Sequence, residues 1–158
     1  MRLTPKAEPM GQYPADTLRE VFYVSRALLG PEDVQPLLTR ARLNNQRLGL
    51  TGALLYSGGH FAQLLEGPGE ALAQVMDAIA RDARHDQLRC LQQGDIAQRR
   101  LGDWDMAFLN GPGADDLLQQ LLWSEQDLPP ERVQRLMQHL LAAADPAAQA
   151  RSSGARNS

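Results

Sequence analysis

Short runs of apolar and β-branched residues alternate with stretches of helical periodicity between about residues 19 and 109. The short runs predict strands over residues 19–26, 50–57, 60–67, 87–94 and 105–109. Apolar residues spaced three, four and seven apart predict a helix that begins near Pro31 and carries residues 34–41, and a second over residues 72–79. The predicted element order is therefore βαββαββ.

Two glycines, Gly58 and Gly59, separate the second and third predicted strands. Such a pair can take the positive φ angles of a tight turn, so it predicts a β-hairpin. A hairpin in the middle of this element order is typical of the α+β class, in the ferredoxin-like arrangement of an antiparallel sheet with two helices on one face. That fold serves many functions and does not decide between them.

Two further helices are predicted near the C-terminus, over residues 115–123 and 130–144. Their leucines exceed what two short helices can bury on each other, so we expect them to cover the sheet face opposite the first two helices. A homodimer or partner surface is the alternative. The predicted organisation is a flexible segment over 1–17, a domain over 18–111, a helical appendage over 112–145 and a disordered tail over 146–158.

The overall composition limits the function classes. The chain has 158 residues, a formal net charge of −3 and one cysteine, and no apolar run approaches the roughly 20 residues of a membrane helix. Without a basic field, nucleic acid is not an expected partner. An unpaired cysteine and the absence of a secretory signal pattern at the N-terminus predict a cytoplasmic location, with no membrane partner.

Polar side chains interrupt the predicted apolar faces at three places. Asn44 and Asn45 continue the apolar stripe of the first helix, and Gln63 shares a strand face with Phe61 and Leu65. A buried amide without a partner costs about 1–3 kcal/mol, so each needs a partner. The asparagines could simply mark the end of the helix, and the glutamine could lie on an edge strand or bind water. The hydroxyl of Tyr23 is expected on the same side as Gln63.

Amides, a phenol and the large side chains of Trp104 and Met106 suit a flat heteroaromatic ligand, whose edges need hydrogen bonds and whose faces need apolar contacts. The sequence has no metal-ligand cluster, phosphate-binding loop or evident nucleophile. Acid/base catalysis with Glu66 as acid and His85 as base is an alternative, although surface roles are expected for both. A regulatory module without a chromophore is another.

Several segments with matching order and spacing resemble the BLUF domains, the flavin-binding blue-light photoreceptors of bacteria and some protists. The resemblance covers roughly residues 19–110. It is carried by the segments Tyr23–Ala27, Asn44–Asn45, Leu50–Tyr56, Phe61–Gly67, Arg81–His85 and Arg99–Met106.

The resemblance implies roles for individual residues. Tyr23 matches the photoactive tyrosine and Gln63 the switching glutamine, while Trp104 and Met106 match a pair on the last strand whose exchange near the flavin has been debated. The residues implied to bind the cofactor are Asn44, Asn45, Gln63, Arg84 and His85. The implied cofactor is FAD, with FMN or riboflavin tolerated in some members.

The resemblance also implies a mechanism and a type of protein. In the family's scheme, light excites the oxidised flavin, an electron and a proton leave the tyrosine through the glutamine, and a rearranged glutamine hydrogen bond remains. The chain is then a photosensory signalling protein and not an enzyme, expected to act on an unknown downstream partner and to form a homo-oligomer. Ala41 stands where several members have a serine near the glutamine, so the kinetics or the size of the spectral shift should differ.

Overall fold

The computed structural model describes residues 17–102 and 106–143. Five strands form one sheet in the order β4-β1-β3-β2-β5. The strands are β1 (Leu18–Ala27), β2 (Thr51–Tyr56), β3 (His60–Pro68), β4 (His85–Asp95) and β5 (Ala107–Asn110). The helices are α1 (Val34–Leu48), α2 (Gly69–Ala80), α3 (Asp115–Trp123) and α4 (Pro130–Ala143), with single 3-10 turns at Pro31–Asp33 and Pro112–Ala114. The order βαββαββ and the ferredoxin-like α+β fold are confirmed. None of the described helices is long and apolar enough to cross a lipid bilayer.

The sheet is mixed and not wholly antiparallel, which corrects the prediction from sequence. β5 pairs with β2 in parallel, with Ala53 opposite Ala107. The cause lies in the strand order: β4 and β5 follow each other in the chain but form opposite edges of the sheet. The chain must therefore cross the sheet before β5 enters beside β2. The last strand is predicted over residues 105–109. Its first residue, Asp105, and the preceding Trp104 lie outside the described residues.

The β2–β3 hairpin is confirmed. Its turn closes with a hydrogen bond of 3.0 Å from the amide of Ser57 to the carbonyl of His60. Only one of the two glycines has a positive φ angle: Gly58, with φ of 101°. Gly59 does not have a positive φ angle. Since the turn fixes which residues pair, it also sets the register of β3 beside β2.

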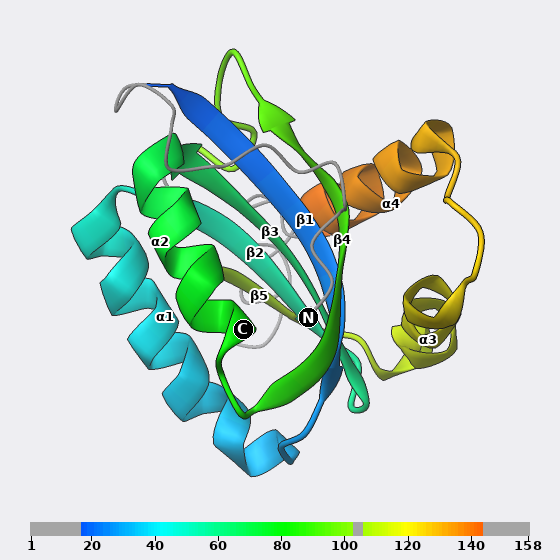
Figure 1. The fold of residues 1–158 in the computed structure, drawn as a ribbon. Helices are drawn as coiled ribbons and strands as arrows, with labels where there is room; N and C mark the ends of the chain where they lie inside the picture. Colours follow the sequence, from blue (N-terminus) through cyan, green and yellow to red (C-terminus); the bar gives the residue numbers. More distant parts are fainter. Residues whose placement is uncertain (1–16, 103–105, 144–158) are drawn as a thin grey trace, which may run out of the picture.

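The two faces of the sheet carry separate apolar cores, covered by different helices (Figure 1). Strand alternation divides β3 between them: Phe61 and Leu65 belong to the core under α1 and α2, while Ala62 and Leu64 belong to the core under α3 and α4. The buried residues that α3 and α4 contribute are Leu118, Leu121, Leu122, Val133, Met137 and Leu140. The C-terminal helices thus cover the face opposite α1 and α2, as predicted, while the boundary near residue 111 stays a prediction.

The start of α3 is fixed to the hairpin turn by one carboxylate. Oδ1 of Asp115 accepts hydrogen bonds from Ser57 Oγ at 2.6 Å and from the amide of Gly59 at 3.0 Å, and lies 2.9 Å from His60 Nδ1. The hydrogen bond from His60 is the main cause that holds the pKa of Asp115 below its ordinary value, followed by that from Ser57. The contacts join the sheet to the C-terminal helices.

Candidate functional site

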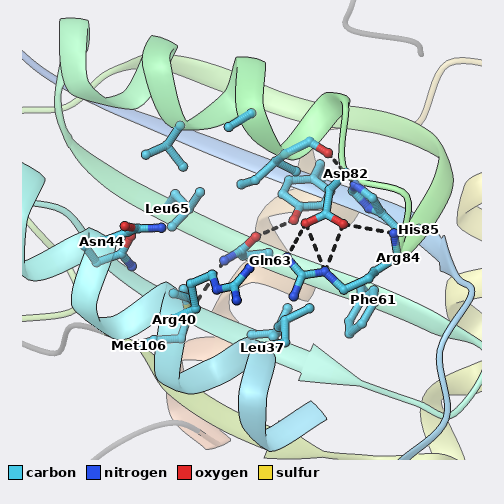
Figure 2. A pocket seen from close by; sticks show the side chains of 17 residues that line it. Leu37, Arg40, Asn44, Phe61, Gln63, Leu65, Asp82, Arg84, His85 and Met106 are labelled. Atoms are coloured by element: carbon cyan, nitrogen blue, oxygen red, sulfur yellow. Dashed lines mark hydrogen bonds and ion pairs between the residues drawn. The ribbon is translucent and has the colours of Figure 1, made fainter. Parts of the chain in front are cut away.

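A cavity of about 300 Å³ lies between α1, α2 and the adjacent sheet face (Figure 2). Its apolar walls come from both helices and from the strands, namely Leu37, Ala41, Leu54, Phe61, Leu65, Val75, Ala78 and Ile79. Its polar lining consists of Tyr23, Arg40, Asn44, Asn45, Gln63, Asp82, Arg84 and His85, with Met106 beside them. Every candidate residue of the described chain that the sequence assigned to the photoactive or cofactor-binding set lines this one cavity.

Tyr23 and Gln63 meet at the floor of the cavity. They are directly opposite each other in the antiparallel register of β1 and β3, so their side chains leave the sheet on the same face. The Tyr23 hydroxyl donates a hydrogen bond to Gln63 Oε1, drawn as a dashed line that ends at the labelled Gln63 (Figure 2). Burial raises the pKa of Tyr23 well above its ordinary value, and the negative charge of Asp82 adds to the rise. The phenol is therefore neutral and holds its proton at physiological pH.

Gln63 occupies a central strand, not an edge. β3 lies between β1 and β2 in the five-stranded order, which removes the edge-strand alternative considered from the sequence. The Nε2 group of Gln63 lies 3.6 Å from the sulfur of Met106. Both ends of the buried amide thus have partners, with Oε1 as acceptor toward Tyr23 and Nε2 as donor toward Met106.

Asn44 and Asn45 lie in the last turn of α1, which ends at Leu48 with Gly49 in a left-handed conformation. The helix-end interpretation is correct for their position, because the Asn45 carbonyl accepts the amide of Leu50 at 2.9 Å. It does not exclude the binding interpretation, since both asparagines line the cavity. The side chain of Asn45 is buried and that of Asn44 is exposed to solvent. One amide therefore faces the interior of the site and the other lies at its mouth.

Arg84 and Asp82 form a charged pair at the other end of the cavity. Nε of Arg84 donates to Asp82 Oδ1 at 2.9 Å, and the backbone amide of Arg84 donates to the same oxygen at 2.9 Å. The hydrogen bonds from Arg84 lower the pKa of Asp82. The resemblance implied a positive side of the site here, and the carboxylate of Asp82 offsets that charge.

His85 lines the cavity, and both of its ring nitrogens have partners within the protein. Its Nε2 lies 2.6 Å from the carbonyl oxygen of Ile79, which can only accept, so Nε2 carries a proton. Its Nδ1 lies 2.8 Å from the hydroxyl of Ser25. The ring stands edge-on to Tyr23, with centroids 6.2 Å apart. Because both nitrogens have protein partners, His85 offers apolar ring surface to a ligand.

Glu66 is absent from the cavity lining and lies on the other face of β3. The carboxylate is fully buried and accepts the amides of Arg100 at 3.0 Å and Leu101 at 2.9 Å, together with the hydroxyl of Thr51 at 3.0 Å. Glu66 therefore fixes the segment around residue 100 and does not converge with His85. Asp86, the neighbour of His85, is paired with Arg26 instead.

Arg40 and Asp82 are site residues that the sequence reasoning missed. Arg40 lies one helical turn from both Leu37 and Asn44, and all three line the cavity. The same three-and-four spacing that placed Asn44 would have found it. Asp82 precedes Arg84 by two residues. An aspartate side chain that accepts a hydrogen bond from the backbone amide two residues later in the chain is a common turn motif.

The residues present fit a flavin. Its planar ring system needs apolar contacts on both faces and hydrogen-bond partners along its polar edge. Helix residues such as Leu37 and Ile79 present apolar side chains to the cavity, and the amide residues Asn44, Asn45 and Gln63 line it as well. A volume of about 300 Å³ lies at the lower end of the range for small-molecule sites.

Comparison with known proteins gives an independent result. A family model described as BLUF, "Sensors of blue-light using FAD", matches residues 18–107. The structure of BlrB, a BLUF protein in its dark state, is 32% identical, superposes with a TM-score of 0.70, and covers 82% of this chain and 99% of its own.

Two curated relatives are longer proteins. The photoactivated adenylate cyclase subunit beta of Euglena longa is 30% identical over 150 residues, which is 88% of this chain and 17% of that protein. The blue light- and temperature-regulated antirepressor BluF of Escherichia coli (strain K12) is 35% identical over 88 residues, 54% of this chain and 22% of that protein. The chain thus spans less than a quarter of the length of these two relatives.

Proposed function

Because this chain belongs to the BLUF family of blue-light sensors, we propose that it binds oxidised FAD between α1 and α2 and responds to blue light by rearranging the hydrogen bond between Tyr23 and Gln63. The observation that carries the proposal is that pair itself. A buried phenol donates to a buried amide on the floor of a cavity whose walls suit a flavin. No other described residues combine a redox-active side chain with a switchable hydrogen-bond partner in this cavity.

Tyr23 and Gln63 have distinct roles in the proposal. A bound flavin supplies the absorption of blue light and an acceptor for one electron. Tyr23 supplies the electron and the proton, and Gln63 Oε1 is the first atom that can receive that proton. An amide presents an acceptor at one end and a donor at the other, so rotation or tautomerisation of Gln63 changes which group faces its neighbours. A carboxylate at this position would lack that property.

The remaining cavity residues hold the cofactor. Asn44 and Asn45 would bind the polar edge of the ring, while Arg84 supplies positive charge and His85 supplies ring contact. FAD is proposed as the bound species because the family's description names it. Release of the cofactor by denaturation, followed by chromatography against FAD, FMN and riboflavin standards, identifies the species.

The output is proposed to pass from Met106 through β5 to α3 and α4. Met106 contacts Gln63 and directly precedes β5, which leads through a 3-10 turn into α3. On the outer side of α3, Leu117 and Trp123 are exposed, and such side chains suit self-association or an unidentified signalling partner. The names of two curated relatives, a photoactivated adenylate cyclase subunit and a blue light- and temperature-regulated antirepressor, connect light with an output in those proteins.

The absorption spectrum of the purified protein tests the proposal. We expect an oxidised-flavin spectrum that shifts slightly to the red under blue light and returns in darkness. A protein that stays colourless after reconstitution with FAD would contradict the proposal and favour a regulatory module without a chromophore. A yellow protein with no reversible shift would retain flavin binding and contradict the switch.

A further inference from the structure

Met106, which directly precedes β5, is held in place by contacts from two other elements. Nε2 of Gln63 on β3 lies 3.6 Å from its sulfur, and Nε of Arg42 on α1 donates to its backbone carbonyl at 3.1 Å. The side chain is almost completely buried in the core that includes Tyr23. Both its backbone and its side chain are therefore fixed from outside β5.

Gly52 on β2 provides the space that the Met106 side chain fills. A Cβ atom at residue 52 would lie 3.0 Å from Met106 Cε, 3.1 Å from Met106 Sδ and 2.9 Å from Leu65 Cδ2. Its backbone does not have a positive φ, so no conformational reason requires glycine here. A glycine inside a strand often marks a close approach of another group, and at Gly52 two groups approach closely, the thioether of Met106 and Cδ2 of Leu65.

The thioether also affects the orientation of Gln63. A thioether sulfur accepts hydrogen bonds weakly and cannot donate one. With Met106 in this place, the Gln63 amide gains a hydrogen-bond partner at the sulfur only when Nε2 faces it, and Oε1 then faces the Tyr23 hydroxyl. The reversed amide would place two acceptors, Oε1 and the sulfur, against each other.

We propose that Gly52 and Arg42 are positioning residues that hold Met106 against Gln63 and thereby set the resting orientation of the Gln63 amide. Gly52 does so by leaving room for the thioether, and Arg42 by tying the Met106 carbonyl to α1. The effect on the photocycle rests on the proposed function. The role of Gly52 and Arg42 in holding Met106 against Gln63 does not.

The first experiment observes Met106 directly. Protein labelled with ¹³C at the methionine methyl groups gives one resonance per methionine, and Met106→Leu assigns the one of interest. Gly52→Ala and Arg42→Gln should each shift the Met106 resonance, while that of Met137, which lies in the core on the other face of the sheet, stays in place.

The matched controls are Gly94→Ala, where an added Cβ meets nothing within 4 Å, and Arg47→Gln, at an exposed residue of the same helix. Neither should move the resonance. An unchanged Met106 resonance in both Gly52→Ala and Arg42→Gln would overturn the proposal. Should Gly52→Ala fail to fold, the Arg42→Gln comparison decides alone. This readout needs no bound flavin, so it separates failure of this inference from failure of the proposed function.

The second experiment uses dark recovery of the red-shifted state. Gly52→Ala should change its rate about threefold or more, since loss of one hydrogen bond typically corresponds to a twofold to tenfold effect. If Gly52 acts through Met106, the same substitution in a Met106→Ala background should have a much smaller effect, because the two contacts with the thioether are gone and only the contact with Leu65 Cδ2 remains. Equal effects of Gly52→Ala in both backgrounds would contradict a route through Met106.

Discussion

Tyr23 and Gln63 face each other across neighbouring strands with the phenol as donor and the amide oxygen as acceptor. The arrangement needs no loop: both side chains leave central strands on one face of the sheet. Strands of this kind are among the least mobile parts of a domain. Any light-driven change at this pair therefore begins as a side-chain rearrangement within a rigid frame.

Tyr23→Phe is expected to retain flavin and lose the reversible red shift, because the ring still packs while the donor to Gln63 Oε1 is gone. Absorption spectra before and after illumination measure both properties. Tyr56→Phe is the matched control, since Tyr56 lies in the same core but bonds to the carbonyl of Leu29 and does not line the cavity. A normal photocycle in Tyr23→Phe would remove the proposed electron donor.

Gln63→Leu should likewise bind flavin without a red shift, because leucine keeps similar volume and removes both ends of the amide. Gln63→Glu separates the two ends: it preserves acceptor oxygens toward Tyr23 but, when ionised, cannot donate to the sulfur of Met106. We expect it to lack the wild-type shift as well. A wild-type shift in either variant would show that the amide is not the switch.

Asn45→Ala is expected to weaken flavin binding about tenfold, the effect of removing one buried hydrogen-bond partner. Titration of the apoprotein with FAD, followed by flavin fluorescence, gives the dissociation constant. The exposed Asn110 at the end of β5 supplies the control substitution to alanine. An unchanged dissociation constant in Asn45→Ala would leave the asparagine with only its role at the end of α1.

Asp115→Asn tests the contact between α3 and the hairpin through its pH dependence. The pKa of Asp115 lies below the ordinary value of 3.8, so the carboxylate contributes stability above that pH, and the contribution disappears as the pH falls through the lowered pKa. Urea unfolding should give a difference between wild type and Asp115→Asn of a few tenths to about 1 kcal/mol at pH 7, because the group is partly exposed. The difference should shrink toward pH 3. Asp116→Asn, at an exposed neighbour, should show no such dependence.

Leu121→Ala should lower the free energy of unfolding by about 2–5 kcal/mol, since the side chain is fully buried between α3 and the sheet. Leu117→Ala, on the exposed side of the same helix, should change it by less than about 0.5 kcal/mol. Equal effects in chemical denaturation would mean that α3 does not pack on the sheet as described.

The sequence pattern was sufficient for the order of the elements and for the faces on which Gln63 and the two asparagines lie. Alternation placed Gln63 with Phe61 and Leu65, and helical spacing placed both asparagines at the end of α1. The pattern could not distinguish a central from an edge strand for β3, because that depends on pairing between segments far apart in the chain. For the same reason it missed the parallel pairing of β5 and the amides of Arg100 and Leu101 that satisfy Glu66.

The strand order also has a consequence for the kinetics of folding. The β2–β3 hairpin pairs residues near in sequence, such as Tyr56 with Phe61, whereas β4 and β5 join the sheet through distant pairs such as Ala27 with His85 and Ala53 with Ala107. Distant pairs form slowly because a long loop must close first. Pulse-labelling hydrogen exchange during refolding should therefore find the hairpin protected before either edge strand. The cavity is enclosed only when residues of β1, β3, α1 and α2 and Met106, directly before β5, have come together. A chain part-way through refolding would therefore have its hairpin formed and its cavity still open.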